Sequence, residues 1–255
     1  MELLQVKDIT KVFPTPQGED HVVLEDVNFS VNEGEFISLL GPSGCGKTTL
    51  LTMIGGFQDP TSGAIFLDGN EITGPSAEKG YVFQNYALFP WMTVEKNIAY
   101  GLQFKNMTQE EKNRRVDEML QLANLKGHEE KLPIQLSGGM QQRVAVARAL
   151  ACKPRVLLLD EPLGAVDFQM RELMQNQMDM LVGKAGITVV MVTHDVAESV
   201  FLSDRVLVMG SSRGEILEDV TIRLPKPRDR DCEEYIEYVE HLTSLLRKAF
   251  GRTEA

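Results

Sequence analysis

The chain of 255 residues has few of the features that mark membrane or secreted proteins. Its unbroken apolar runs, such as Val156–Leu159, are far shorter than the roughly 18 residues that a membrane-spanning helix needs. The first residues lack the basic start and apolar centre of a signal peptide, and the three separated cysteines form neither a disulfide framework nor a zinc pattern. We therefore expect a protein of a reducing compartment, the cytoplasm.

Basic residues are scarce relative to acidic ones. The chain has 26 Lys and Arg against 37 Asp and Glu, which gives a net charge of −11. Nucleic acid is not expected as a partner, because its phosphates are neutralised by clustered Lys and Arg. A single nucleotide needs positive potential at one loop only, so the acidic balance leaves that class of ligand open.

The hydrophobic patterns of the first eighty residues predict strands around a glycine-rich loop. Residues 27–31 alternate between apolar and polar side chains, and Phe36–Leu40 is a short apolar run, as in strands. A helix is expected over Thr48–Ile54, and Asp68-Gly69 is a hairpin signal.

The rest of the chain reads first as helical and then as a βαβ repeat. Residues from about Thr93 to Ala151 have apolar positions at helical spacing, and we expect a mostly helical subdomain there. Strands are expected again at Val156–Leu159, Thr188–Val192 and Val206–Met209, as in a parallel sheet. The segment 224–230 favours neither helix nor strand. A C-terminal amphipathic helix should follow, with an apolar face made of Tyr235, Ile236, Val239, Leu242, Leu246 and Phe250.

The strongest chemical signal is the segment Gly41-Pro42-Ser43-Gly44-Cys45-Gly46-Lys47-Thr48, which fits the phosphate-binding pattern G-x-x-x-x-G-K-[ST]. Small residues let backbone amides point at phosphate oxygens, and the next helix adds its positive N-terminal end. Lys47 should neutralise the β- and γ-phosphates, and the Thr48 hydroxyl should hold Mg²⁺. The alternative is a glycine-rich turn without a ligand. Cys45 should be either a reactive thiolate protected by nucleotide or an unreactive buried residue.

Four further polar residues follow predicted strands. Asp160 and Glu161 end the strand at 156–159, where Asp160 would support the metal and Glu161 would take the proton of the attacking water. Gln84 follows a short strand and is long enough to contact both Mg²⁺ and that water. His194 lies 34 residues after Asp160 and is a candidate contact of the γ-phosphate. The alternatives are a strand leaving the core and an ordinary surface histidine.

The segment Leu136-Ser137-Gly138-Gly139 opens a second helix with the properties of an anion site. Ser137 suits the N-cap, and the two glycines permit close approach to the helix end. The helix should end near Ala151, because Pro154 follows. The alternative is an ordinary capped helix start. A second anion-binding helix start is difficult to satisfy within one nucleotide site.

In this order the motifs resemble those of the ATP-binding subunits of ABC transporters, over roughly residues 1–220. The resemblance implies a P-loop NTPase (ABC ATPase) of the α/β class with a mixed central sheet, an antiparallel β subdomain and an inserted helical subdomain at about 86–152. Residues 221–255 would form a C-terminal extension. In that family two copies face each other head-to-tail, and the L-S-G-G of one closes over ATP on the P-loop of the other.

The resemblance also implies roles for individual residues. Phe13 stands where the family stacks an aromatic ring on adenine, and Leu163–Asp167 occupies its D-loop. Met140 and Val166 differ from the commonest residues of the family, but neither removes a phosphate contact. The expected catalytic residues are Lys47, Gln84, Glu161 and His194. The expected nucleotide contacts are Phe13, Gly41, Pro42, Ser43, Gly44, Cys45, Gly46, Lys47, Thr48, Thr49, Ser137, Gly138 and Gly139. The expected metal contacts are Thr48, Gln84 and Asp160.

Within the family, Gly74–Gln84, Leu88–Val94 and Leu224–Arg230 resemble the nitrate/sulfonate/taurine/bicarbonate import group. We therefore expect the ATP-hydrolysing subunit of an importer for a small solute such as one of these anions. Its expected partners are a second, identical ATPase subunit, membrane subunits that dock near Gln84–Trp91, and an extracytoplasmic solute-binding protein. It would lie peripherally on the cytoplasmic face of the membrane. An exporter subunit and a soluble ABC-type ATPase are the alternatives.

Overall fold

The computed structural model describes residues 1–14, 20–163 and 168–251. The chain forms two compact units, one from Met1–Ser76 with Thr188–Ala255 and the other from Ala77–Ile187. In the described ranges, no helix has both the length and the apolar character that a bilayer crossing requires.

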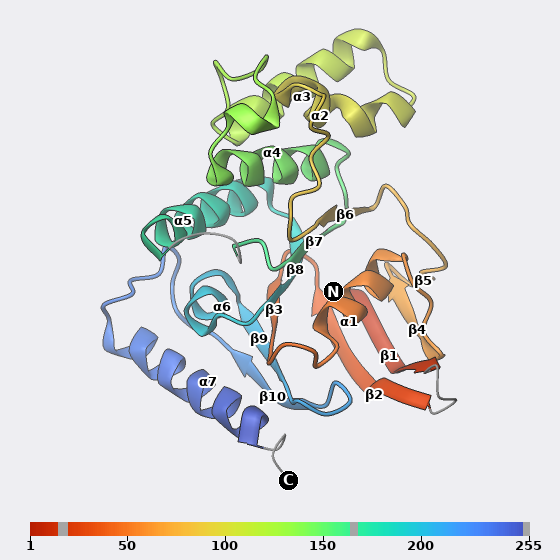
Figure 1. Cartoon of the computed structure of the whole chain (residues 1–255), viewed down its shortest axis with the longest axis vertical. Helices are drawn as coiled ribbons and strands as arrows, with labels where there is room; N and C mark the ends of the chain where they lie inside the picture. Colours follow the sequence, from red (N-terminus) through yellow and green to blue (C-terminus); the bar gives the residue numbers. More distant parts are fainter. Residues whose placement is uncertain (15–19, 164–167, 252–255) are drawn as a thin grey trace. The chain divides into compact units, whose positions relative to one another are not determined.

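The first unit contains an antiparallel sheet with the strand order β2-β1-β4-β5 (Figure 1). Its strands are β1 (Glu2–Pro14), β2 (Asp20–Asn32), β4 (Ser62–Leu67) and β5 (Asn70–Glu71). The alternation predicted over 27–31 is confirmed in part: Val27 and Val31 are buried and Asn28 is exposed, but Phe29 and Ser30 are both half-buried. The predicted hairpin is confirmed as well. Asp68 and Gly69 have φ angles of 52° and 76°, as a tight two-residue turn requires.

A second set of strands in the first unit positions the glycine-rich loop. The central strand β3 (Phe36–Leu40) pairs in parallel with β8 (Thr188–Thr193) on one edge and with β9 (Arg205–Met209) on the other. The strand β10 (Ile216–Thr221) pairs antiparallel with β9, so the sheet is mixed, as expected. All five residues of β3 are buried, and its backbone is paired on both edges. Helix α1 (Lys47–Gly55) follows β3, and helix α6 (Val196–Leu202) follows β8.

The second unit is mostly helical, and this confirms the prediction for the stretch from Thr93 to Ala151. Its two strands, β6 (Lys79–Val82) and β7 (Val156–Asp160), pair in parallel. Its helices are α2 (Val94–Ala99), the 3₁₀ helix η1 (Tyr100–Phe104), α3 (Gln109–Leu122), the 3₁₀ helix η2 (Pro133–Gln135), α4 (Gly138–Ala151) and α5 (Phe168–Ala185). Helix α4 contacts α2, α3 and α5 and is the shared support of this unit.

The C-terminal helix α7 (Glu233–Gly251) is present as predicted, and it packs against α6, β9 and β10 of the first unit. Its predicted apolar face is partly wrong. Tyr235 and Leu242 are buried, but Ile236 and Phe250 are 47% and 53% exposed. Leu245 and Ala249, which were not part of the predicted face, are buried instead. The helix carries two adjacent apolar stripes, and packing on the sheet selects the one that contains Tyr235.

Candidate functional site

The glycine-rich loop leaves the carboxyl end of the buried strand β3 and ends at Gly46, the N-cap of α1. Gly46 has a φ of 102°, and a Cβ there would lie 2.6 Å from a methyl carbon of Leu24 on β2. A Cβ on Gly41 would lie 2.9 Å from the backbone oxygen of Met209 at the end of β9. The neighbouring strands therefore leave room for backbone only, and they fix the path of the loop.

Lys47 lies under this loop. Its residue is only 5% exposed, and its ammonium donates hydrogen bonds to the backbone oxygens of Gly41, at 2.8 Å, and Pro42, at 2.7 Å. Ser43, Gly44 and Thr48 are exposed instead. These exposed positions can be reached from solvent, and the buried Lys47 charge is bonded to the backbone of the same loop, an arrangement that suits an anion.

The remaining loop residues differ in exposure. Pro42 is buried, and Thr49 is half-buried in the first turn of α1. Cys45 is buried, with its sulfur 3.9 Å from the Lys47 ammonium. Burial raises the pKa of the Cys45 thiol, although Lys47 opposes this effect. Of the two alternatives for Cys45, this burial favours the unreactive buried residue, because loss of solvent outweighs the nearby positive charge.

His194 is placed next to this loop by strand register. It directly follows Thr193, the last residue of β8, and Thr193 is opposite Leu40 in the parallel pairing. Leu40 in turn precedes Gly41. Adjacent strands lie about 4.8 Å apart, so the exposed His194 leaves the sheet beside the start of the loop.

Phe13 lies on β1, half-buried, with the Lys11 ammonium 5.1 Å from its ring centroid. Its pairing partner on β2 is His21, three residues before the Leu24 that contacts Gly46. At about 3.4 Å per residue, the ring lies roughly 10 Å along the strand from the loop. This spacing suits a nucleotide base whose phosphates lie on the loop.

In the second unit, the ends of β6 and β7 bring together the predicted glutamine and carboxylates. Val82 pairs in parallel with Leu159, so the residues that follow these two strands leave the sheet at the same, carboxyl end. The Gln84 side-chain amide donates a hydrogen bond of 3.2 Å to the Glu161 carboxylate. Glu161 has a φ of 43°, a backbone conformation that costs of order 1–3 kcal/mol for a residue with a side chain.

The sequence did not predict the partner of Asp160 in this unit. The Tyr81 hydroxyl donates a 3.3 Å hydrogen bond to the buried Asp160 carboxylate. Burial, and then the negative charge of Asp160, raise the pKa of Tyr81 well above its ordinary value, so the phenol remains a donor. No sequence signal pointed to this contact, because the two residues are 79 positions apart.

The second predicted anion site is the start of α4. The Ser137 hydroxyl accepts a hydrogen bond of 3.4 Å from the Met140 amide, which makes Ser137 the N-cap. Ser137 and Gly138 are exposed, Gly139 is half-buried, and the preceding Leu136 is buried. The buried Leu136 therefore holds the segment in place, while the start of α4 that follows it is exposed to solvent. Of the predicted D-loop, Leu163 is buried, and 164–167 lie outside the described residues.

Arg148 on the same helix is a functional candidate that the sequence analysis missed. Its guanidinium donates hydrogen bonds to the backbone oxygens of Tyr86, at 2.9 Å, and Ala87, at 2.7 Å. Both residues have positive φ angles, 62° and 44°. Burial lowers the pKa of Arg148, but an arginine remains charged. Arg148 therefore connects the helix that begins at Ser137 to the strained loop that follows Gln84.

An aromatic surface extends from this loop. The ring of Phe89 lies 4.4 Å from that of Tyr100 and 5.7 Å from that of Trp91, while the Tyr100 and Phe104 rings are 5.7 Å apart. Trp91 is 72% exposed and Phe104 is 77% exposed. Large exposed aromatic side chains next to one another are typical of a protein-binding surface.

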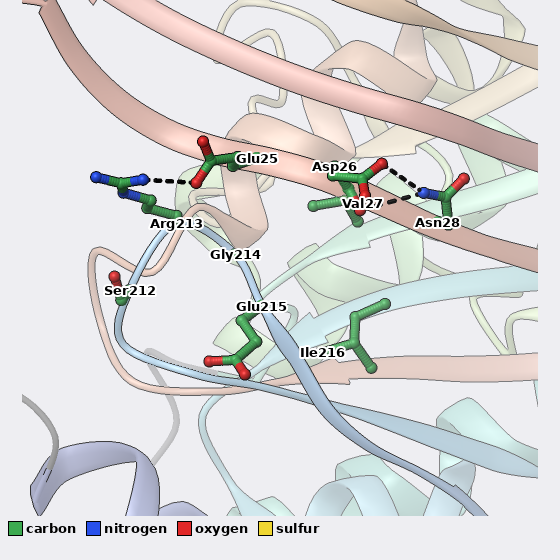
Figure 2. A pocket seen from close by; sticks show the side chains of 9 residues that line it. All are labelled: Glu25, Asp26, Val27, Asn28, Ser212, Arg213, Gly214, Glu215 and Ile216. Atoms are coloured by element: carbon green, nitrogen blue, oxygen red, sulfur yellow. Dashed lines mark hydrogen bonds and ion pairs between the residues drawn. The ribbon is translucent and has the colours of Figure 1, made fainter.

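The first unit also has a pocket of about 600 Å³ between β2 and the loop that joins β9 to β10 (Figure 2). Its charged side chains are those of Glu25, Asp26, Arg213 and Glu215. Arg213 pairs with Glu25 at 2.6 Å. The remaining carboxylates would repel a triphosphate, and no predicted site residue lines this pocket.

The donor chemistry of the predicted metal residues fits magnesium. Thr48 in the first unit, and Gln84 and Asp160 in the second, each carry an oxygen donor of the kind Mg²⁺ prefers. Across the described part of the chain, no three His, Cys, Asp or Glu side chains are grouped as a metal site. The residues thus suit an ion that takes one or two protein oxygens and completes its shell with phosphate and water.

Comparisons with known proteins agree with this geometry. Residues 24–164 match the family described as ABC transporter. The chain is 42% identical to the nitrate import ATP-binding protein NrtD of Synechocystis over 96% of its length and 95% of that protein. It is 46% identical to the taurine import ATP-binding protein TauB of Roseobacter denitrificans, over 87% and 82% of the two chains. The spermidine/putrescine import ATP-binding protein PotA of Acidothermus cellulolyticus is 49% identical over 84% of this chain but only 56% of its own length.

A solved structure gives the same result for the fold. A dimeric, post-hydrolysis ATP-binding cassette bound to ADP and Pi superimposes with a TM-score of 0.74 and 34% identity, over 87% of this chain and 99% of the other. The expected fold class is thereby confirmed, and so is the expected resemblance to import ATP-binding proteins. The chain belongs to the ABC transporter family, as an ATP-binding subunit of its import systems that hydrolyses ATP to drive transport.

Proposed function

We propose that two copies of this chain form a head-to-tail dimer in which each ATP is held by the P-loop of one copy and the Ser137–Gly139 helix start of the other. The observation that carries this proposal is the exposed, Ser137-capped start of α4. This helix start has the features that suit an anion, and it belongs to a different unit from the loop at Gly41–Thr48. The dimeric form of the similar cassette supports the same arrangement.

In this dimer, the residues of the first unit bind the nucleotide. The loop Gly41–Gly46, exposed at Ser43 and Gly44, takes the phosphates together with Thr48 and Thr49, and the buried Lys47 charge bonds to the loop backbone. Phe13 stacks on the base. His194 contacts the γ-phosphate, a role supported by its place beside the start of the loop.

The residues of the second unit carry out hydrolysis. Glu161 accepts the proton of the attacking water, and Gln84, which already bonds to Glu161, helps to orient that water. Thr48, Gln84 and Asp160 would hold Mg²⁺, which supplies neutralisation of the charge that develops on the phosphate oxygens. Tyr81 fixes the orientation of the Asp160 carboxylate through its hydrogen bond.

The transport partner would bind the aromatic surface at Trp91, Phe89 and Phe104. We propose that a membrane subunit inserts a short apolar helix there, on the side of the loop that follows Gln84. Arg148 would pass a movement of that loop to α4, because it bonds to both segments. The protein would then lie peripherally on the cytoplasmic face of the membrane, and an extracytoplasmic solute-binding protein would deliver the cargo.

We propose a small anion as the cargo, of the nitrate, sulfonate, taurine or bicarbonate type. The similarity to the nitrate, bicarbonate and taurine import relatives, at 42–46% identity over 87–96% of this chain, supports this class. Uptake of labelled nitrate and of labelled taurine by cells that carry or lack this subunit tests the class. Accumulation of neither anion would contradict it, and outward transport would favour the exporter alternative.

The dimer is tested with the Glu161→Gln variant. Removal of the base should trap the ATP-bound state, because binding contacts remain while proton abstraction is lost. Size-exclusion chromatography with Mg-ATP should then show a dimer for Glu161→Gln. The matched control is Glu172→Gln, an exposed carboxylate on α5, which should hydrolyse ATP normally. A Glu161→Gln variant that remains monomeric with bound ATP would contradict the proposal.

A further inference from the structure

The segment Lys226–Arg230, here called the basic strap, has no role in the site described above, yet its side chains converge on one short helix. The Arg228 guanidinium donates to the backbone oxygen of Val200, and the Lys226 ammonium donates to that of Leu202 at 3.0 Å. The Arg230 guanidinium stacks 3.6 Å from the centroid of the Phe201 ring. All three contacts are at the C-terminal end of α6.

These contacts supply the hydrogen-bond donors and the positive charge that the C-terminal end of a helix lacks. The last carbonyls of any helix have no intrahelical partner, and the helix dipole makes them a site of negative potential. Helix α6 has seven residues, too few to be stable without outside contacts. Arg228 is 5% exposed, and its buried charge is directed at this end. The Tyr235 hydroxyl of α7 contacts the other end of α6, through a 3.0 Å hydrogen bond to the oxygen of Ala197 in the first turn.

The strap also connects α6 to the strand that leads into the P-loop. The carboxylate of Asp204, just after α6, forms an ion pair with the Lys226 ammonium at 3.1 Å. Its carboxylate also accepts a 2.9 Å hydrogen bond from the amide of Phe36, the first residue of β3. Ser203 and Ser38 of the same segments are hydrogen-bonded through their hydroxyls.

The other end of α6 begins beside His194. Asp195, the next residue, is the N-cap and accepts a 2.9 Å hydrogen bond from the Glu198 amide. The Thr193 hydroxyl donates to the Glu198 carboxylate, and it accepts from the Asp195 amide at 3.0 Å. His194 is therefore held between two residues that bond to the first turn of α6.

We propose that Lys226 and Arg228 are positioning residues for ATP hydrolysis, which act by fixing α6 and thereby the orientation of His194. The inference rests on the contact proposed between His194 and the γ-phosphate. It gives the C-terminal extension a function in ATP hydrolysis, since the strap and α7 together order the helix that follows His194.

The test compares steady-state ATP hydrolysis by the purified full-length chain and its variants. Lys226→Ala combined with Arg228→Met should lower kcat at least about tenfold, because small displacements of a catalytic group are costly. KM for ATP should change by less than about twofold, since the P-loop contacts remain. The single variant Arg228→Lys, which keeps a positive charge at this position, should have most of the wild-type rate of ATP hydrolysis. Arg223→Ala, which removes an exposed positive charge three residues before the strap, is the matched control and should hydrolyse ATP at the unchanged rate.

A double-mutant cycle separates positioning from simple destabilisation. If the strap acts through His194, the strap variant should cause no further loss of kcat in a His194→Ala background. An equal fractional loss in both backgrounds would overturn the proposal, and so would an unchanged kcat in the wild-type background. If His194→Ala alone leaves kcat unchanged, the role proposed for His194 itself is wrong.

A second measurement covers the case in which Arg228→Met does not fold. Lys226→Ala alters an exposed side chain, and the proposal predicts that amide hydrogen exchange in α6 becomes at least about tenfold faster. Amides of α1 should keep their exchange rates. Unchanged exchange in α6 would show that the strap does not order it and would overturn the proposal independently of the role of His194.

Discussion

The P-loop of the first unit and the Gln84–Glu161 edge of the second are held in place by different means. The loop is fixed by close packing and backbone conformation, since a Cβ at Gly41 would meet the backbone oxygen of Met209 and Gly46 has a φ of 102° beside Leu24. The edge is fixed by hydrogen bonds between long side chains, and it contains residues such as Glu161 and Tyr86 in costly left-handed conformations.

This difference suits two different tasks. A phosphate cradle gains affinity from a rigid, preformed arrangement of amides, because little order has to be created on binding. An edge held by a few exchangeable hydrogen bonds can adopt a second arrangement at modest cost, as a switch between states requires. This difference is consistent with the proposed roles, in which the close-packed region binds nucleotide and the hydrogen-bonded region transmits movement to the transport partner.

The largest predicted effect is that of Gly46→Ala in the close-packed region. The added Cβ would meet Leu24 at 2.6 Å in a backbone conformation that disfavours side chains, so the loop must change shape. We expect the affinity for ATP, measured by calorimetry, to fall by at least about 100-fold, or about 2.7 kcal/mol.

Gly34→Ala is the matched control for this variant. Gly34 has a φ of 76°, and nothing lies within 4 Å of its would-be Cβ. It should lose about 1 kcal/mol of stability from backbone strain alone and keep its affinity for ATP. Similar ATP affinities of the two variants would show that packing does not fix the loop.

A smaller effect is expected from Arg148→Met in the hydrogen-bonded region. The substitution keeps the aliphatic stem but removes two charge-assisted hydrogen bonds to Tyr86 and Ala87. We expect the free energy of unfolding, measured with urea, to fall by about 2–3 kcal/mol. The affinity for ATP should stay unchanged, because the P-loop is fixed independently. If the affinity for ATP fell in proportion to the loss of stability, the P-loop would not be fixed independently of the hydrogen-bonded region.

Arg114→Met is the control for that loss of charge. Arg114 is exposed on α3, so its replacement should change stability by less than about 0.5 kcal/mol.

The smallest effect concerns Cys45, within the close-packed loop. Burial raises the pKa of its thiol above the ordinary value of 9.0, which lowers the thiolate fraction at neutral pH. Alkylation followed by mass spectrometry at pH 7.5 should label the half-buried Cys232 first and Cys45 last. Labelling of Cys45 should accelerate as the pH rises through and above 9.0. Preferential labelling of Cys45 at neutral pH would show an open, electropositive loop instead of a packed one.

Sequence patterns predicted the parts of this molecule that depend on local order. The run Phe36–Leu40, the glycine-rich loop and the Ser137 cap follow from spacing and residue type alone, and the structure places them as expected. Patterns could not predict contacts between residues far apart in the sequence, such as those of Tyr81 with Asp160 or of Arg148 with Ala87. Nor could they predict which apolar stripe of α7 is buried, or that burial dominates the pKa of Cys45, because tertiary packing decides both.

The most direct test of the two-chain site mixes two inactive variants, Lys47→Ala and Ser137→Arg. In a head-to-tail dimer, each mixed pair contains one site with the intact P-loop of one copy and the intact Ser137 helix start of the other. Random pairing predicts that an equal mixture recovers about a quarter of the wild-type ATPase activity, provided the two sites act independently. Activity no greater than the sum of the separate variants would contradict the account, because each site would then be complete within a single chain.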